Sequence, residues 1–349
     1  AIYFVWQSLQ FNATMRYQLP IYPLLAMMAG WILVEGLKSK VAKPTFNLRP
    51  VTFAIGTIVL ALTAIWAFAF LNVYTRPETR MTASRWIYQN VPAPINLRYT
   101  DGTSQPLPYP AEASIANGAP YLTTFIATTD GALTEILLPH VLATPASTQT
   151  LSVSLLGQPD SAPILAAAHT SEFRTADDPR GGPVTFKFDA PFLLVKGQTY
   201  FLRIETTGAV KLTGAAIANE TDYDWNLPFR IDGFDAFGGL YRGDLNLQVY
   251  WDDNADKVSR FQNILDQTDY IFIPTNHQYG QITRIPERYP LTTLYYRELI
   301  GCPPGEDIIR CYRVAEPGTY EGRLGFELVQ TFESYPTLGP IVINDGAAE

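Results

Sequence analysis

The sequence contains the apolar run Val51-Thr-Phe-Ala-Ile-Gly-Thr-Ile-Val-Leu-Ala-Leu-Thr-Ala-Ile-Trp-Ala-Phe-Ala-Phe-Leu71, and residues 50–75 around it carry no charge. A helix needs about 20 apolar residues to cross the hydrocarbon core of a bilayer, because no water is present there to bond the backbone. This run is long enough. We therefore predict a membrane-spanning helix at this place in the chain.

A second apolar segment precedes this run. Residues 17–34 carry no charge and end in Leu24-Leu-Ala-Met-Met-Ala-Gly-Trp-Ile-Leu-Val34, after two prolines that suit the first turn of a helix. We predict a second full span here, and residues 1–6 have the composition of an earlier, truncated one. The alternative is a pair of buried helices in a soluble core, although soluble helices seldom run this long without a charge.

The loop between the two segments fixes the expected orientation. It runs from Lys38 to Arg49 and holds four cations and no anion. Cytoplasmic loops collect Lys and Arg, so the loop is expected in the cytoplasm and everything after about Val73 outside it. The sequence therefore predicts a multi-pass protein of the cell membrane with an extracytoplasmic C-terminal domain.

The charge of the chain is divided unevenly. The whole sequence has a formal net charge of −8, yet residues 1–72 contain more cations than anions, so the remainder is strongly acidic. An acidic domain does not bind nucleic acid through its net field, and it offers no polybasic patch for anionic lipid. Membrane lipid is the expected partner of the apolar segments, and we expect no nucleic-acid partner.

The expected domain organisation has three parts. Residues 1–75 form the transmembrane helices with their basic loop. The β-sandwich is assigned to residues 99–251. From residue 121 to residue 251 the sequence shows period-two patterns separated by turn residues, which are typical of an antiparallel sandwich of the jelly-roll kind. The expected strands are 122–128, 134–138, 151–156, 184–188, 199–205, 211–218 and 245–251. Residues 99–120 are expected to be an extended connection and not a core element.

The third part is a small α/β layer made of residues 76–98 and 252–349. Helical patterns lie at 82–89, 256–267 and 290–299, and short apolar strands are expected at 269–274 and 326–332. Because the helix at 82–89 precedes the sandwich, the sandwich is interpreted as an insertion into this layer. The fold class is therefore mixed, with transmembrane helices followed by an α/β layer and an inserted β-sandwich.

Few residues of the sequence point to chemistry. Cys302 and Cys311 are expected to form a disulfide, since they lie in the part predicted to be exported. No metal site is expected, because the three histidines have no ligand partners at a suitable spacing. His277 follows a predicted strand, where a functional or a loop-stabilising role is open.

Two further patterns each have two readings. The acidic run Asp252-Asp-Asn-Ala-Asp256 superficially resembles a calcium loop, but helix N-capping explains it more simply. Aromatic and acidic residues cluster at 222–226 and 234–241. They suit either a sugar-binding surface or the interface with the α/β layer.

The chain also resembles a known family. The segments Arg16-Tyr-Gln-Leu-Pro-Ile-Tyr-Pro23, Ala83-Ser-Arg-Trp-Ile-Tyr-Gln-Asn-Val-Pro92 and Leu265-Asp-Gln-Thr-Asp-Tyr-Ile-Phe-Ile-Pro274, with the region of residues 279–297, are similar to the C-terminal part of bacterial family 39 glycosyltransferases. These are polytopic, lipid-carrier-dependent enzymes related to the protein mannosyltransferases. The sandwich is similar to that family only as a pattern of strands.

The resemblance implies transfer of a sugar from a polyprenyl-phosphate carrier to an acceptor on the outer face. The catalytic carboxylate of the family lies in an external loop upstream of Ala1, so no catalytic residue is assigned here. The resemblance places Arg16 and Tyr17 where such enzymes approach the carrier phosphate, whereas His277 stands where the family would have an Arg. It implies no cofactor beyond the polyprenyl-phosphate-linked sugar, which is the donor substrate.

The resulting expectation is the C-terminal section of a membrane glycosyltransferase, with an outer domain that positions the acceptor or covers the site. The rival expectation is a non-catalytic membrane subunit that serves as a structural partner in a larger complex. A third is a membrane-tethered carbohydrate-binding module. The sequence does not name the donor sugar, the acceptor or a partner subunit.

Overall fold

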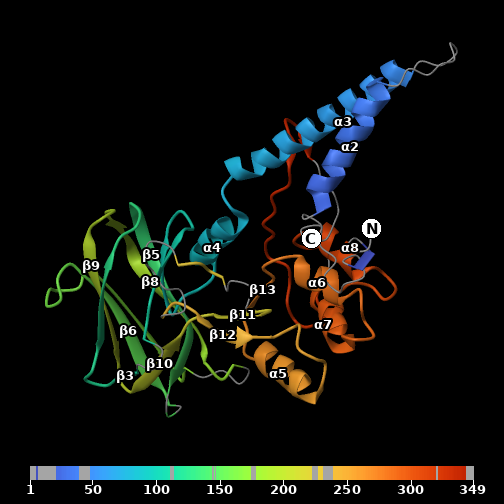
Figure 1. Cartoon of the computed structure of the whole chain (residues 1–349). Coiled ribbons are helices and arrows are strands. Elements are labelled where there is room, and N and C mark those ends of the chain that lie inside the picture. The colour runs from blue at the N-terminus through green and yellow to red at the C-terminus, as the bar shows by residue number, and fades with distance from the viewer. Residues whose placement is uncertain are drawn as a thin grey trace. The chain divides into compact units, whose positions relative to one another are not determined.

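The computed structural model of the chain divides it into two compact units (Figure 1). Unit 1 comprises residues 1–79 and 275–349, and unit 2 comprises residues 80–274. The expected boundary between sandwich and α/β layer at residue 252 therefore does not coincide with a unit boundary. The structure describes the following residues: 5–6, 21–38, 48–110, 114–143, 145, 147–173, 178–221, 227–230, 239–319 and 321–342.

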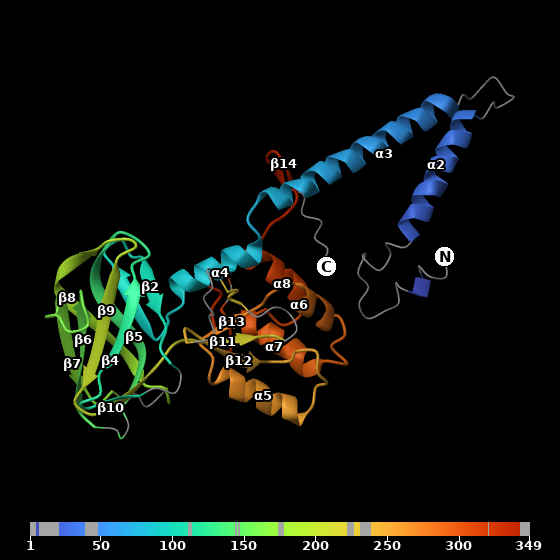
Figure 2. The ribbon, with the colours of Figure 1, turned by 60° about the vertical axis from the view of Figure 1, so that its left-hand side comes forward.

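Unit 2 contains two antiparallel sheets that enclose one core (Figure 2). In the larger sheet the strand order is β2-β1-β5-β10-β3, with β8 paired to the other edge of β5; in the smaller sheet it is β4-β9-β6-β7. The bounds of the larger sheet are β1 Ile95–Tyr99, β2 Ser104–Leu107, β3 Ile115–Ala116, β5 Gly131–Ala143, β8 Gly182–Leu194 and β10 Ala209–Thr213. Those of the smaller sheet are β4 Tyr121–Ile126, β6 Gln149–Leu156, β7 Leu165–Ser171 and β9 Thr199–Thr206.

The sandwich forms because its strands bury alternate residues. Along β9, Tyr200, Leu202 and Ile204 are buried and face the core, while their neighbours in the strand are more exposed. Leu133 of β5 and Leu151 of β6 contribute to the same core from the two sheets. The antiparallel sheets predicted from period-two patterns are thus confirmed. The stretch 99–120, predicted to be a connection outside the core, instead contains β2 and β3 and contributes Leu107 and Ile115 to the core.

A third sheet of unit 2 is parallel. It has the order β12-β11-β13, with β11 Ala216–Asn219, β12 Arg242–Asn246 and β13 Tyr270–Phe272. Helix α5, Ala255–Leu265, connects β12 to β13, and helix α4, Thr79–Asn90, precedes β1. Both helices were predicted from the sequence, and their bounds agree with the pattern to within a few residues.

The predicted sandwich strand at 211–218 is wrong as a single element. It is divided between β10 in the large antiparallel sheet and β11 in the parallel one. The chain passes between the sheets at Gly214, where a Cβ atom would lie 2.4 Å from the carbonyl oxygen of Leu240. Only glycine allows this close backbone approach. The strand predicted at 245–251 likewise proves to be the end of β12 and the loop after it.

Unit 1 begins with two apolar helices. Helix α3, Leu48–Leu71, belongs to the one segment among the described residues that is long and apolar enough to cross a membrane. Its side chains are exposed, including Phe53 (67%) and Leu60 (70%). Helix α2, Tyr22–Lys38, has 17 residues and is shorter than a usual span. The turn η2, Asn72–Thr75, follows α3.

The regular elements in the rest of unit 1 are mainly short helices. Its helices are α6 His277–Ile282, α7 Pro290–Ile300 and α8 Ile308–Val314, and a short hairpin of β14 Thr337–Leu338 and β15 Ile341–Val342 follows. Helix α7 was predicted, with Pro290 in its first turn. The strand predicted at 326–332 is wrong, because these residues form no regular element. Their apolar residues do not pair with another strand among the described residues.

Candidate functional site

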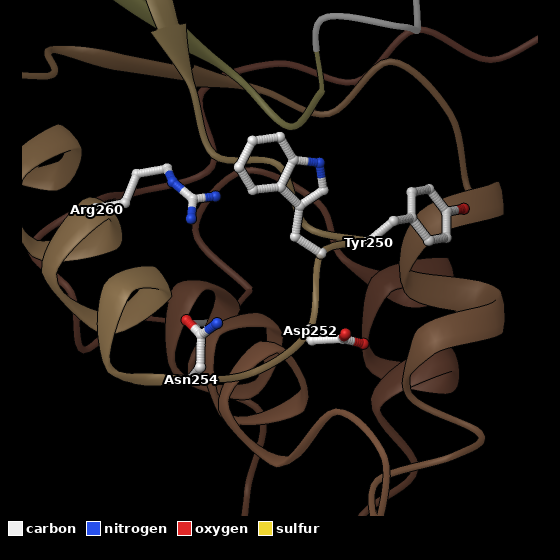
Figure 3. A pocket seen from close by; sticks show the side chains of 5 residues that line it. Tyr250, Asp252, Asn254 and Arg260 are labelled. Carbon is white, nitrogen blue, oxygen red and sulfur yellow. The ribbon is translucent and has the colours of Figure 1, made fainter.

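A shallow depression lies on unit 2 at the loop between β12 and α5. Its volume is about 390 Å³, and it is lined by Tyr250, Trp251, Asp252, Asn254 and Arg260. Figure 3 shows Tyr250 and Arg260 at opposite ends of the depression, with Asp252 and Asn254 along one side. An aromatic surface with a few convergent polar groups is the usual composition of a site for a small ligand.

The loop that forms this depression is held in place by hydrogen bonds from Lys257 of α5. The ammonium group donates to the carbonyl oxygens of Val249 (2.8 Å) and Trp251 (2.6 Å) and to Oδ1 of Asp253 (2.7 Å). The Lys257 side chain is fully buried, and these three bonds use its three N–H donors. The backbone on both sides of Trp251 is therefore held in place.

The same acidic run also starts α5. Asn254 is the N-cap of the helix, and its Oδ1 accepts a hydrogen bond from the backbone N–H of Lys257 at 2.9 Å. Asp253 forms the buried ion pair with Lys257. The N-capping interpretation of residues 252–256 is thus confirmed, and the described residues contain no group of His, Cys, Asp or Glu able to hold a metal ion.

Burial has an electrostatic consequence for the ammonium group. It disfavours the charged form and lowers the pKa of Lys257 below its ordinary value, although the hydrogen bond to Asp253 opposes this shift. The buried pair depends on both partners, since either charge alone would stay desolvated. Lys257 is therefore a structural residue that positions the loop.

Trp251 and Arg260 stack against each other in the depression. The guanidinium carbon of Arg260 lies 4.4 Å from the centre of the Trp251 ring, and Trp251 remains 56% exposed. Among the described residues, none accepts a hydrogen bond from the buried Nη1 of Arg260. The depression thus combines an exposed indole, the guanidinium of Arg260 stacked against it and the exposed carboxylate of Asp252.

A cluster of charged groups forms a second feature of unit 2. Arg180 donates to both oxygens of Asp269 (2.7 and 2.8 Å) and to both oxygens of Asp178 (3.1 and 2.9 Å). His140 of β5 lies beside them, with Nδ1 3.3 Å from Asp178 Oδ2. Asp269 also accepts from the backbone N–H of Ala216 in β11. The cluster connects the sandwich to the parallel sheet.

The pKa values of this cluster fit a structural role. Burial opposes ionisation of Asp178, but hydrogen bonds and the charge of Arg180 outweigh it, so the pKa of Asp178 lies below its usual value. The two carboxylates raise the pKa of Arg180 above its ordinary value. Both acids accept hydrogen bonds from the same guanidinium, which holds their carboxylates in place. We therefore take the depression at Trp251, and not this charged cluster, as the candidate ligand site.

The residues singled out from the sequence are distributed as follows. Arg16 and Tyr17 lie outside the described residues, as do residues 222–226 and most of 234–241. Cys302 and Cys311 are joined by a disulfide, with 5.9 Å between their Cα atoms. His277 opens α6, and its Nδ1 lies 3.0 Å from Nε2 of Gln281. None of these described residues belongs to the depression at Trp251.

Sequence reasoning missed Trp251, Lys257 and Arg260. The run 245–251 was assigned to a sandwich strand, which made Trp251 a strand residue. The signal that could have revealed the site is an aromatic pair followed directly by two acids and an Asn at a helix start. Nothing in the pattern, however, shows that Lys257 is buried.

Comparison with models of known protein families and with curated proteins gives no match.

Proposed function

We propose that the chain is the C-terminal section of a membrane glycosyltransferase that moves a sugar from a polyprenyl-phosphate carrier to an acceptor on the outer face. The depression at Trp251 would hold the acceptor glycan. The observation that carries this proposal is the pairing of an exposed indole with Arg260 in a fixed polar depression. The resemblance of residues 16–23 and 83–92 to family 39 glycosyltransferases supports the same reading.

The chemistry of the depression favours a sugar. The C–H face of a pyranose can cover the exposed ring of Trp251, which provides a large apolar contact. Hydroxyl groups at the edge of the sugar can accept from Arg260 and donate to Asp252. Asp252 disfavours a strongly anionic ligand, so the carrier phosphate would bind elsewhere. We propose Arg16 and Tyr17 for that role.

A membrane setting is supported by α3. Its 24 residues match the length of a span, and its apolar side chains are exposed as lipid-facing residues would be. The basic loop at 38–49 favours a cytoplasmic location for the start of α3. In the proposed arrangement the chain is multi-pass, and both the disulfide and the depression at Trp251 lie outside the cytoplasm.

The test is an acceptor-dependence assay with the intact protein purified from its native membrane. Transfer of labelled sugar from a polyprenyl-phosphate donor to oligosaccharide acceptors is measured for the wild type, Trp251→Ala and Trp251→Phe. Trp251→Ala should raise KM for the acceptor roughly tenfold with little change in kcat, because stacking is lost equally in ground and transition states. Trp251→Phe keeps a ring and should recover much of the loss.

A second variant separates the donor from the acceptor. Arg16→Ala should raise KM for the carrier and leave KM for the acceptor unchanged. Unchanged turnover of Arg16→Ala at limiting carrier would remove the proposed role of Arg16. If the intact protein transfers no sugar from any polyprenyl-phosphate donor, the glycosyltransferase proposal fails, and the rival function as a non-catalytic subunit of a membrane complex is favoured.

A further inference from the structure

The hairpin of β14 and β15 in unit 1 has an unusual surface. Leu338 (38%), Ile341 (61%) and Val342 (57%) are exposed on strands of two residues each. Residues 334–342 carry no charge. Exposed apolar side chains are ordinary when scattered, but a group of them at the tip of a small hairpin indicates a contact surface.

The hairpin cannot hold itself together by its own strands. Two-residue strands form too few backbone bonds, and an isolated hairpin is at best marginally stable in water. Gly339 (φ 57°) and Pro340 make the connection, and a positive φ at the first turn position suits a tight hairpin turn. The stability of the hairpin must therefore come from what it contacts.

The structure provides such contacts at the end of α3. The Asn72 side chain, directly after α3, donates to Oγ1 of Thr337 (2.6 Å) and to its carbonyl oxygen (3.2 Å). Arg76 also donates to the Thr337 hydroxyl. Thr337 is buried, whereas the next residue, Leu338, is exposed. The polar side of the hairpin thus faces η2, and its apolar residues remain uncovered by the described chain.

The end of α3 that contacts the hairpin is also apolar and exposed. Phe70 (46%), Leu71 (57%) and Tyr74 (75%) are exposed at the end of the helix, and the rings of Phe70 and Tyr74 meet at 5.8 Å. Figure 2 shows β14 beside this end of α3. Tyr and Trp are enriched where a spanning helix leaves the hydrocarbon core, and Tyr74 is such a residue.

We propose that the β14–β15 hairpin is a membrane-contacting wedge that inserts Leu338, Ile341 and Val342 among lipid chains beside α3. The inference rests on the proposed span of α3. The occupant is lipid and not a protein, because the hairpin contacts the end of α3, whose exposed apolar side chains are themselves proposed to face lipid. Asn72 and Arg76 then lie at headgroup level, where polar groups and phosphates can bond them.

Backbone chemistry limits the depth of insertion. The outer edges of both strands present backbone groups without a strand partner among the described residues. Such groups are not tolerated against hydrocarbon but can bond water and headgroups in the interface. The wedge therefore inserts its side chains only, and its backbone stays in the interfacial layer.

The test uses an environment-sensitive fluorophore such as NBD in the full chain reconstituted in phosphatidylcholine vesicles. A single cysteine is introduced as Ile341→Cys, Leu193→Cys or Leu60→Cys, and the native cysteines are protected by their disulfide. Leu193 is the matched control, because it is a strand residue of unit 2 and is 61% exposed, as is Ile341. Leu60 reports on the middle of α3.

The expected result is a blue-shifted emission at position 341 that is quenched by lipids brominated near the headgroup. The label at 193 should show aqueous emission, and the label at 60 should be quenched by lipids brominated deep in the chain. Val342→Cys gives a second reporter should Ile341→Cys disturb the hairpin. Aqueous emission at 341 and 342 with a quenched label at 60 would overturn the wedge alone. An unquenched label at 60 would overturn the span of α3 and, with it, the wedge.

Discussion

The side-chain amide of Asn72 donates hydrogen bonds to both the hydroxyl and the carbonyl of Thr337, a residue 265 positions later in the chain. Its other amide atom, Oδ1, accepts from the Thr75 hydroxyl at 2.8 Å, which orients the group. The end of the apolar helix α3 is thus joined to the C-terminal hairpin. These hydrogen bonds make the hairpin a part of the structure at the end of α3.

Breaking this tie should loosen the hairpin. Asn72→Ala removes the two hydrogen bonds to Thr337, each worth about 1 kcal/mol, together with the bond from Thr75, so amide exchange in residues 337–342 should accelerate roughly fivefold or more. Hydrogen–deuterium exchange of the full chain in detergent measures the effect. Thr57→Ala is the control, because Thr57 bonds only within α3, to the carbonyl of Phe53. Equal exchange in wild type and Asn72→Ala would contradict a stabilising role for the tie.

The buried ion pair between Lys257 and Asp253 should contribute strongly to the stability of the loop that contains Trp251. Lys257→Met leaves Asp253 as a buried charge without its partner and should cost about 3–5 kcal/mol of unfolding free energy. Denaturation of the full chain in detergent, followed by circular dichroism, gives the value. Lys187→Met is the matched control on an exposed strand position and should change stability by less than about 0.5 kcal/mol. A loss no greater than that of the control would show that Lys257 is dispensable.

Asp178 should make the protein sensitive to acid. Its pKa is lower in the folded chain than the unfolded value of about 3.9, so the folded state gains stability from it above about pH 4. That stability is lost as the pH falls through the folded pKa. The melting temperature of Asp178→Asn should therefore depend less on pH below 4 than that of the wild type. Asp160→Asn, at an exposed loop position, should retain the wild-type slope.

The disulfide offers a test of both stability and location. Cys302 and Cys311 close a short loop, and losing the bond in Cys302→Ser/Cys311→Ser should cost about 2–3 kcal/mol. In intact cells, maleimide reagents should add mass to the wild type only after reduction, since exported disulfides persist. Labelling of both thiols in native membranes without reduction would place this part of the chain in a reducing compartment, contrary to the proposed topology.

Local pattern alone was sufficient for part of the regular elements. The uncharged run of α3, the helical periodicity of α4, α5 and α7, and the alternation in β6 and β9 each arise from neighbours along the chain. The failures have physical causes of longer range. Residues 211–218 look like one strand, but the approach of Leu240 at Gly214 divides them between two sheets. Residues 326–332 have a strand-like composition but lie beside no strand that would pair with them in the described chain.

The sequence by itself predicted an apolar helix of spanning length, an acidic remainder with antiparallel strands, and a disulfide between the two cysteines. Tertiary structure alone decided which side chains meet. The parallel pairing of β11 with β13 brings Asp269 to Arg180, and folding of the β12–α5 loop around the Lys257 ammonium presents Trp251 to Arg260. Burial and partner choice depend on contacts between distant segments, and these carry no periodic signal along the chain.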